Sequence, residues 1–382
     1  MKKVSQWIPF NRASGLDCDI PKLQQAIDGA HIAGDGPFSH QAETLLQQWF
    51  GGGRSLLTPS CTHALELCAL LLDLGPHDEV IVPAYTFTST ATAFALRGAR
   101  PVFVDVRPDT LNLDFDQVRT SITSKTRAIC LVHYAGVAAS PEEFATLASD
   151  NGLTLIEDNA HGLFGSFKGK PLGTFGSLST LSFHETKNIT CGEGGAVHIN
   201  DMSLHDRAMV LREKGTNRSR FLMGEVDKYT WVDHGSSWVL SDLLAALLVG
   251  QLERRVEIQD RRSRIWSRYS DDLHVWASAN DVVLPSVPDG VDHPAHLFHL
   301  RLPNRRSRDH FISHLGAEGV NAVFHYQALN TSTQGAIFGG KPGQCPVAER
   351  ASETLVRLPL HLGLSDSDID RVIAAATSFV VS

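Results

Sequence analysis

Short apolar runs alternate with helical stretches over the first two thirds of the chain. Several runs are apolar at every position, a pattern typical of strands that helices cover on both faces of a sheet. The stretches between them repeat apolar residues every three to four positions, as amphipathic helices do. The alternation predicts an α/β fold with a doubly wound sheet. The predicted strands are residues 56–58, 79–82, 101–104, 128–132, 154–157, 178–183 and 196–199, and the main predicted helices are residues 39–50, 62–72, 89–97 and 141–151.

The pattern changes near residue 250. A long amphipathic helix is predicted at 249–272, and a stretch rich in proline and aspartate follows it. Beyond that stretch the chain predicts a small α+β unit. We place the boundary so that residues 1–255 form a large domain with the N-terminal segment and residues 256–382 a small C-terminal domain. The elements expected in the small domain are strands at 297–302 and 320–325 and helices at 307–318 and 366–379.

Composition and charge narrow the classes of protein. The chain has 382 residues, of which 42% are apolar and 20% charged, close to the average of folded globular proteins. Its net charge of −8 repels phosphate backbones, so we expect no nucleic-acid partner. The densest basic stretch, residues 254–268, carries interleaved acidic residues and is interpreted as a solvated helix face.

The location of the protein is also constrained. The longest apolar run, residues 243–250, is far shorter than the roughly 20 residues that cross a bilayer, so we expect no membrane segment. The N-terminal residues lack the apolar stretch of a secretion signal. The six cysteines form no Cys-x-x-Cys pair, which predicts neither a disulfide framework nor a metal site. These features favour the cytoplasm.

Lys187 lies on a loop that follows an apolar strand and leads into Gly192-Glu193-Gly194-Gly195. Strands of an open α/β sheet end at the ligand crevice, and glycines let the backbone approach a ligand closely. An activated lysine amine can form a Schiff base with an aldehyde. The alternative, for Lys187 taken alone, is an ordinary surface lysine.

Asp158 stands at the end of the apolar strand 154–157. A carboxylate in this place can pair with a protonated pyridine nitrogen, the partner that pyridoxal phosphate (PLP) requires as an electron sink. The alternative is an Asx turn or a helix N-cap.

Two further strand ends carry candidate contacts. Ser60 and Thr62 stand where a strand passes into a helix, whose first N–H groups suit a phosphate, although simple N-capping explains them equally well. Tyr85 and Phe87 follow the next strand, where an aromatic ring can stack on a flat cofactor or simply pack in the core.

Together, the four strand ends supply an anion site, an aromatic face, a carboxylate and a lysine. These are the contacts that a phosphorylated pyridine aldehyde needs, and a non-catalytic α/β scaffold would not explain their coincidence. No G-x-G-x-x-G or G-x-x-x-x-G-K-[ST] motif competes with this interpretation. The sequence therefore predicts PLP as the cofactor.

The segment 182–195, SFHETKNITCGEGG, with 157–161, EDNAH, resembles the sugar-nucleotide aminotransferases, a DegT-like family of fold-type I PLP enzymes. The resemblance runs from Gly34 to Leu360. It implies an aspartate aminotransferase-like fold with a large doubly wound mixed sheet and a small C-terminal α+β domain. Segments 211–218 and 227–231 look like the subgroup that aminates TDP-4-keto-6-deoxy-D-glucose at its 4-position, with L-glutamate as donor.

The resemblance also implies residue roles. Lys187 would carry the cofactor and shuttle the proton, Asp158 would pair with the pyridine nitrogen, Phe87 would stack on the ring, and His161 would lie near the ring hydroxyl. Cys61, Thr62 and Ser182 would contact the phosphate, together with Ser237 of a second subunit, at the position where the family has an asparagine. The substrate would contact Asp35, Pro37, His184, His325 and Tyr326.

The same resemblance implies a homodimer with shared active sites, with the aromatic residues of segment 221–238 near the interface. Lys187 is intact, whereas relatives that dehydrate their substrate carry histidine there, so transamination is favoured. A 3-keto sugar or a cyclitol ketone remains an alternative substrate. A PLP-binding regulator is a further alternative, although residues 1–35 are too short for a helix-turn-helix module.

Overall fold

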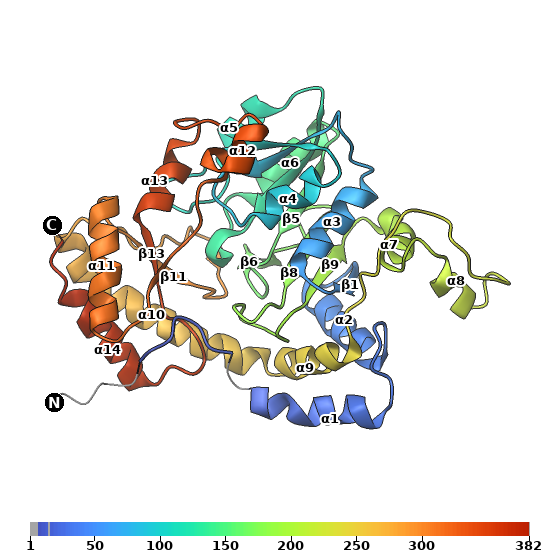
Figure 1. Cartoon of the computed structure of the whole chain (residues 1–382), viewed down its shortest axis with the longest axis horizontal. Coiled ribbons are helices and arrows are strands. Elements are labelled where there is room, and N and C mark those ends of the chain that lie inside the picture. The colour runs from blue at the N-terminus through green and yellow to red at the C-terminus, as the bar shows by residue number, and fades with distance from the viewer. Residues whose placement is uncertain (1–6, 14–15, 382) are drawn as a thin grey trace.

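The computed structural model describes residues 7–13 and 16–381. Its central feature is a seven-stranded sheet in the order β1-β9-β8-β5-β4-β2-β3 (Figure 1). Strand β9 runs antiparallel to both of its neighbours, and every other neighbouring pair is parallel. This confirms the predicted α/β fold with a mixed sheet. The strands are β1 (Arg54–Thr58), β2 (Glu79–Pro83), β3 (Arg100–Val104), β4 (Thr126–Val132), β5 (Thr154–Asp158), β8 (Leu178–Ser182) and β9 (Gly195–Ile199).

Helices cover both faces of this sheet. Val80 and Val82 pack into one core and Ile81, between them, packs into another, because successive side chains of a strand point to opposite faces. Both faces are therefore apolar, which explains the continuous apolar runs in the sequence. The helices around the sheet are α2 (Pro37–Phe50), α3 (Cys61–Leu71), α4 (Ser89–Ala95), α5 (Phe115–Ser121), α6 (Pro141–Asp150) and α7 (His205–Arg212), with α1 (Ile20–Asp28) and α8 (Arg218–Leu222) outside.

The predicted long helix at 249–272 is wrong in its bounds. The structure has two helices, α9 (Asp242–Glu253) and α10 (Arg255–Ala279), which run in succession along the lower edge of the molecule in Figure 1. Arg254 separates them with φ −96° and ψ 14°, outside the helical region. No glycine or proline marks this break, so apolar periodicity alone runs through it.

A second, three-stranded antiparallel sheet lies beyond these helices, in the order β11-β13-β12. It shares a separate core with α10, with helices of the C-terminal segment and with Ile8 from the N-terminal segment. The division at residues 255 and 256 stays a prediction. The strands of this second sheet are β11 (Phe298–Arg301), β12 (Val323–Phe324) and β13 (Leu355–Leu358), and the helices of the C-terminal segment are α11 (Arg305–Ala317), α12 (Thr333–Ile337), α13 (Pro346–Thr354) and α14 (Asp366–Thr377). A third small sheet is formed by β6 (Ser166–Phe167), β7 (Lys170–Pro171) and β10 (Val291–Asp292).

The basic stretch is not entirely solvated, contrary to the interpretation from sequence. Arg262 is buried on α10, and its guanidinium donates to the carbonyl oxygens of Ala295 and His296. Within the described residues no helix combines the length and hydropathy that a membrane crossing needs. Residues 1–6, which contribute to the prediction of no secretion signal, lie outside the described part of the chain.

Candidate active site

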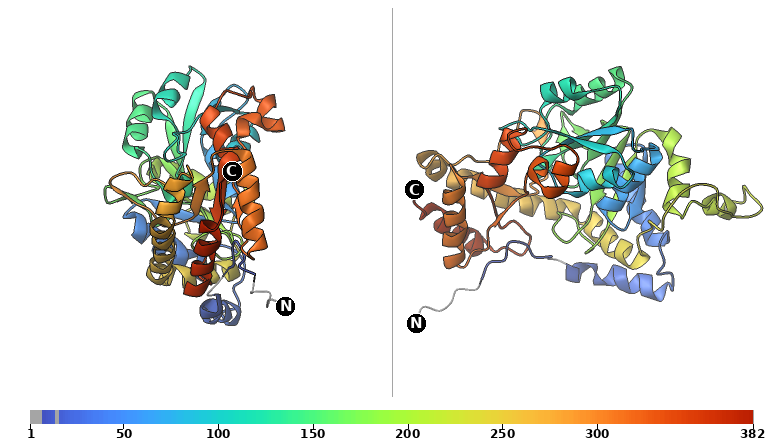
Figure 2. Two further views of the ribbon diagram at one scale, coloured as in Figure 1. Left: turned by 90° about the vertical axis from the view of Figure 1, so that its left-hand side faces the viewer. Right: turned by 45° about the horizontal axis from the view of Figure 1, so that its top comes forward.

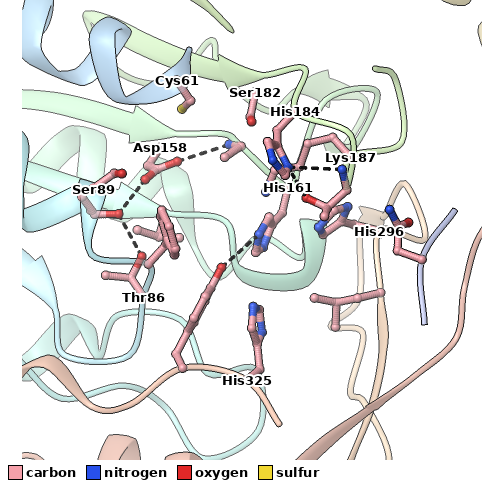
Figure 3. Close-up of a pocket in the computed structure, with 18 of the residues that line it drawn as sticks. Cys61, Thr86, Ser89, Asp158, His161, Ser182, His184, Lys187, His296 and His325 are labelled. Carbon is pink, nitrogen blue, oxygen red and sulfur yellow. Dashed lines mark hydrogen bonds between the residues drawn. The ribbon is translucent and has the colours of Figure 1, made fainter. Parts of the chain in front are cut away.

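Strand ends of the large sheet and loops of the small unit meet at a cavity of about 690 Å³ (Figure 3). The labelled side chains of Asp158, His161 and Lys187 point toward the same space in this view. The structure thus brings together predicted site residues that are up to 265 positions apart, from Cys61 to Tyr326. The predicted residues that line it are Cys61, Thr62, Phe87, Asp158, His161, Ser182, His184, Lys187, His325 and Tyr326.

Lys187 follows β8 on a tight turn, in which its N–H donates to the carbonyl of His184 at 2.9 Å. Burial lowers the pKa of the Lys187 amine, Cys61 and Asp158 oppose this shift, and the charge of Arg357 adds to it, so that the net pKa is about 8. A substantial part of the amine is therefore neutral near physiological pH. The neutral amine is the form that attacks an aldehyde.

The glycines after Lys187 serve the backbone rather than only a ligand. Gly192 has φ +93°, which a residue with a side chain adopts only under strain. A Cβ on Gly195 would lie 2.4 Å from the backbone nitrogen of Cys61. Strand β9 therefore passes directly behind the start of α3, and only glycine permits that approach.

The first turn of α3 offers donors to an anion. The Ser60 hydroxyl caps the helix by accepting from the N–H of His63 at 3.2 Å. The Thr62 hydroxyl hydrogen-bonds Ser89 at 2.7 Å. Capping uses only one of the N–H groups at this helix start, so the first-turn N–H groups of Cys61 and Thr62 suit a phosphate. N-capping and anion binding are thus compatible here rather than alternatives.

Asp158 ends β5 and is buried. Its Oδ2 accepts a hydrogen bond from Thr90 Oγ1 at 2.7 Å, and its Oδ1 accepts one from the N–H of Ala160 at 3.3 Å. Burial raises the pKa of Asp158, and these two hydrogen bonds act in the opposite direction. A protonated pyridine nitrogen would supply the positive partner that this carboxylate otherwise lacks. Thr90 was missed because nothing local distinguishes it from other threonines of α4.

Glu157, the residue before Asp158, points away from the cavity into the sheet. It accepts hydrogen bonds from His133 Nε2 at 2.8 Å and from the N–H groups of Gly173, Phe175 and Gly176 at 2.8, 2.6 and 2.7 Å. Burial acts to raise the pKa of Glu157, but these donors outweigh it and the net shift is downward. Glu157 thereby anchors the strand that presents Asp158.

Histidine and tyrosine rings form the opposite wall. His161 stacks on His296 with ring centroids 4.2 Å apart. The N–H of Ala135 donates to Nδ1 of His161, so its Nε2 carries the proton and donates to the Tyr326 hydroxyl at 3.4 Å. Burial lowers the pKa of His161 well below its usual value, as do the charges of Lys187 and Arg357. The ring is therefore neutral and serves as a hydrogen-bond partner.

His296 and Arg357 also line the cavity, and the sequence did not point to either. His296 comes from the loop that buried Arg262 holds by its carbonyls. Arg357 comes from β13, the central strand of the small sheet, which was not predicted. No sequence signal marks them, because the large and small units contribute to one cavity only in the folded chain.

Three predicted residues lie outside the cavity. Asp35, predicted to contact substrate, accepts a hydrogen bond from buried Arg212 at 2.6 Å, and Arg212 also pairs with Glu43 at 2.9 Å. Asp35, His40 and Glu43 cluster as metal ligands do, but the guanidinium of Arg212 already pairs with both carboxylates. Pro37 is the first residue of α2. Neither Asp35 nor Pro37 lines the cavity of its own chain, and their assignment to the substrate stays a prediction.

Ser237 is exposed and lies in a bridge with Glu213, away from the cavity of its own chain. Its assignment depends on a second subunit and stays a prediction. The segment around α8 that precedes it projects from the body of the molecule, as the right-hand view of Figure 2 shows.

Comparisons with known proteins identify the family of the chain. The model of the DegT/DnrJ/EryC1/StrS aminotransferase family matches residues 17–377. Uncharacterized protein MJ1066 of Methanocaldococcus jannaschii is 31% identical over 90% of both chains. The aminotransferase TlmJ from Streptoalloteichus hindustanus has a TM-score of 0.90 at 29% identity, with 97% of this chain and 98% of that chain covered. The PLP form of Spr1654 from Streptococcus pneumoniae, a putative sugar aminotransferase, has a TM-score of 0.90 at 26% identity, with 97% of this chain and 98% of that chain covered. The pyridoxamine phosphate (PMP) form of Spr1654 matches this chain with the same TM-score and identity.

The chain belongs to the DegT/DnrJ/EryC1/StrS aminotransferase family. It is a PLP-dependent aminotransferase of fold type I. The residues present fit this cofactor: a lysine amine with a lowered pKa, a buried carboxylate that forms no ion pair with any described residue, a helix start with available N–H groups, and the ring of Phe87, which is 56% exposed at the cavity.

Proposed function

We propose that this enzyme transfers the amino group of L-glutamate to a nucleotide-linked keto sugar. The specific substrate we propose is TDP-4-keto-6-deoxy-D-glucose, with TDP-4-amino-4,6-dideoxyhexose and 2-oxoglutarate as products. The observation that carries the proposal is that Lys187, Asp158 and the start of α3 share one cavity. Support for a sugar comes from segments 211–218 and 227–231 and from relatives such as Spr1654.

PLP, when bound, supplies an electron sink for the bonds of the donor carbon. Lys187 would hold the cofactor until the donor amine displaces it, and would then take the proton from the donor carbon as base and deliver it to the cofactor carbon as acid. Asp158 keeps the pyridine nitrogen protonated, and Thr90 holds the Asp158 carboxylate in place. Phe87 stacks on the ring.

The phosphate is held by Cys61, Thr62 and Ser182, the first two mainly through backbone N–H groups. His161 lies beside the ring hydroxyl. His184, His325 and Tyr326 contact the sugar nucleotide, since all three line the same cavity.

A homodimer with shared sites completes the proposal, with Ser237 reaching the phosphate in the partner. It is supported by a group of exposed apolar side chains on and after α8, which a monomer would leave in water: Phe221, Leu222, Met223, Tyr229, Trp231 and Val232. We place the enzyme in the cytoplasm, where activated sugars are made.

The test is a direct assay of the PLP-loaded enzyme with L-glutamate and TDP-4-keto-6-deoxy-D-glucose, with products followed by mass spectrometry. A 3-keto TDP sugar and a cyclitol ketone are assayed beside it. We expect the 4-keto sugar to be converted to its 4-amino product, with formation of an equal amount of 2-oxoglutarate. If only the 3-keto sugar or only the cyclitol ketone is aminated, the proposed 4-keto substrate is wrong. If none of the three is aminated, the proposal that the enzyme acts on a keto sugar is wrong.

A further inference from the structure

His296 lies on the wall of the cavity that holds Lys187, and the mechanism above gives it no task. Its ring stacks on that of His161 with centroids 4.2 Å apart (Figure 3). Its Nδ1 lies 2.8 Å from Oδ1 of Asn188, the residue directly after Lys187. This hydrogen bond joins the cavity wall to the loop that carries the lysine, so the imidazole is fixed close to the reacting centre.

Helix α10 holds the loop on which His296 lies. Buried Arg262 donates to the carbonyl oxygens of Ala295 and His296 at 3.2 and 2.5 Å. Gln259, about one turn earlier on the same helix, donates to the carbonyl oxygen of Pro294 at 3.0 Å. Three successive carbonyls of the loop are therefore tied to one helix, and the imidazole is presented from a rigid backbone.

The contacts of Asn188 determine which nitrogen of His296 carries the proton. Asn188 Nδ2 donates to the carbonyl oxygen of Pro294 at 2.6 Å and to Gln259 Oε1 at 3.1 Å. A carbonyl oxygen only accepts hydrogen bonds, so the amide nitrogen of Asn188 faces Pro294 and its oxygen faces His296. Nδ1 of His296 is therefore the donor and carries the proton.

The other nitrogen, Nε2, is left as an acceptor. Burial lowers the pKa of His296 well below its usual value, and the nearby charges of Lys187 and Arg262 act in the same direction, so the ring is neutral. A neutral imidazole with its proton on Nδ1 has a lone pair on Nε2. Among the described residues only Nδ1 of this ring has a hydrogen-bond partner. The wall thus offers a fixed, uncharged acceptor to whatever fills the cavity.

The two substrates differ in the donors that they bring. The carboxylates of L-glutamate only accept hydrogen bonds, and its amino group is the group that reacts. A keto sugar or a keto cyclitol carries a hydroxyl group on the carbon beside its carbonyl. That O–H donor is one bond away from the reacting carbon, and His296 is hydrogen-bonded to the neighbour of Lys187. The hydroxyl is therefore the donor that suits this acceptor.

We propose that Nε2 of His296 accepts a hydrogen bond from the hydroxyl group beside the carbonyl of the keto substrate. This inference rests on the proposed function and adds a specificity-determining residue to it. The Tyr326 hydroxyl, at the same wall, already accepts from His161 at 3.4 Å. A site built to bond a substrate hydroxyl rejects the analogue that lacks it, because the acceptor is then left without a partner. His296 thereby selects hydroxylated ketones.

The test compares substrates with and without this hydroxyl. Single turnovers of the PMP-loaded enzyme, followed by the absorbance of the cofactor, use TDP-4-keto-6-deoxy-D-glucose and its 3-deoxy analogue. A second readout needs no reaction: calorimetry measures the binding of TDP-6-deoxy-D-glucose, which has no ketone, and of its 3-deoxy analogue to the same PMP form.

Two variants separate the acceptor from the rest of the ring. His296→Asn keeps an N–H for Asn188 but has no atom at the place of Nε2, whereas His296→Gln can put its amide oxygen there. His274→Asn, at an exposed histidine of α10, is the matched control. Thermal unfolding shows whether each variant is folded.

We expect His296→Asn to weaken the response to the hydroxylated sugars by about 5- to 100-fold in both readouts, as a hydroxyl without its acceptor does. The 3-deoxy analogues should respond alike in wild type and His296→Asn. His296→Gln should recover part of the loss, and His274→Asn should match the wild type. The L-glutamate half-reaction of the PLP form should change little, because the donor brings no hydroxyl.

Discrimination between the hydroxylated and 3-deoxy sugars in folded His296→Asn that equals the wild type's would overturn the inference. So would unchanged discrimination with a shifted pH dependence of PLP attachment to Lys187, which would assign Nε2 to the lysine amine. If His296→Asn does not fold, the wild type decides: equal binding of the two TDP sugars would overturn the inference, and weaker binding of the 3-deoxy sugar that His296→Gln reduces further would support it.

Failure of the proposed function is visible in the wild type alone. If the wild type aminates another of the three ketones, the same comparison is made with that ketone and its analogue without the neighbouring hydroxyl. If the wild type aminates none of them, the proposed function and this inference are both overturned. A working wild type with an indifferent His296→Asn overturns only the inference.

Discussion

Thr90 and Asp158 form a hydrogen bond in which Thr90 Oγ1 donates to Asp158 Oδ2 at 2.7 Å. Thr86 hydrogen-bonds Thr90 in turn at 2.9 Å, so one hydroxyl from the loop after β2 and one from α4 support one carboxylate oxygen. The other oxygen, Oδ1, receives only a long bond from Ala160. The arrangement orients Asp158 and leaves Oδ1 available to the pyridine nitrogen.

Replacing Thr90 should lower the turnover rate of the enzyme, while PLP should remain bound. Thr90→Val removes a hydrogen bond to a charged group, so we expect kcat to fall by about 10- to 100-fold. Thr90→Ser keeps the hydroxyl and should restore most of it. Steady-state kinetics of both variants make the comparison. Equal kcat in Thr90→Val and the wild type would show that Asp158 needs no such support.

Asp158→Asn should reduce turnover by several orders of magnitude, because a neutral amide no longer keeps the pyridine nitrogen protonated. The fold should persist, since the amide is nearly isosteric and its oxygen can still accept from Thr90. Kinetics together with thermal unfolding test this. Turnover close to that of the wild type would exclude pairing between Asp158 and the pyridine nitrogen.

Lys187→Ala should abolish the visible absorbance of lysine-bound PLP, whereas Lys168→Ala, which removes an exposed lysine paired with Glu142, should leave it unchanged. For the wild-type apoenzyme, the rate of PLP attachment should rise with pH through an apparent pKa of about 8, because the deprotonated amine of Lys187 reacts. Stopped-flow absorbance measures this rate. A rate that is independent of pH between 6 and 9, or persistent absorbance in Lys187→Ala, would contradict the assignment.

Glu157→Gln should lower the free energy of unfolding by about 3 kcal/mol, since it removes the buried carboxylate that His133 hydrogen-bonds and puts an amide beside backbone N–H donors. The pKa of Glu157 is lowered in the folded state, so its contribution is complete above the unfolded pKa and is lost as pH falls through the folded one. The difference between wild type and variant should therefore shrink in acid. Urea unfolding at several pH values measures it.

The control for this prediction is Glu142→Gln, which removes an exposed pair with Lys168. Exposed pairs contribute about 1 kcal/mol or less. If both variants lose the same small amount, Glu157 does not anchor β5.

Trp231→Asp should disrupt the proposed dimer, because it places a charge in the exposed apolar group around α8, where Trp231 is 76% exposed. Light scattering should show monomers and, if Ser237 reaches the partner's site, weaker PLP binding. Val275→Asp, at a residue 77% exposed on α10, is the control and should leave the dimer intact. If Trp231→Asp remains a dimer and binds PLP as the wild type does, the interface does not include this apolar group.

The strands of the large sheet and the four strand ends that carry Lys187, Asp158, Phe87 and the α3 start could be predicted from sequence. Continuous apolar runs report burial on both faces, and residues that follow such runs must meet at one edge of a parallel sheet. The break at Arg254 and the central strand β13 escaped prediction. The first carries no glycine or proline, and the second is only four residues long and directly follows a helix.

The resemblance implied that Asp35 contacts the substrate, which stays a prediction; in the folded chain Asp35 forms a partly buried ion pair with Arg212, 177 residues later in the sequence. Thr90 beside Asp158, Arg262 behind His296 and Arg357 at the cavity wall likewise became visible only in three dimensions. Local periodicity records which face of a strand or helix is buried, and it does not record which distant side chain meets that face. The sequence by itself determined the class of fold and the cofactor chemistry; tertiary packing decided the partners of the charged groups, because those partners come from elements far apart along the chain.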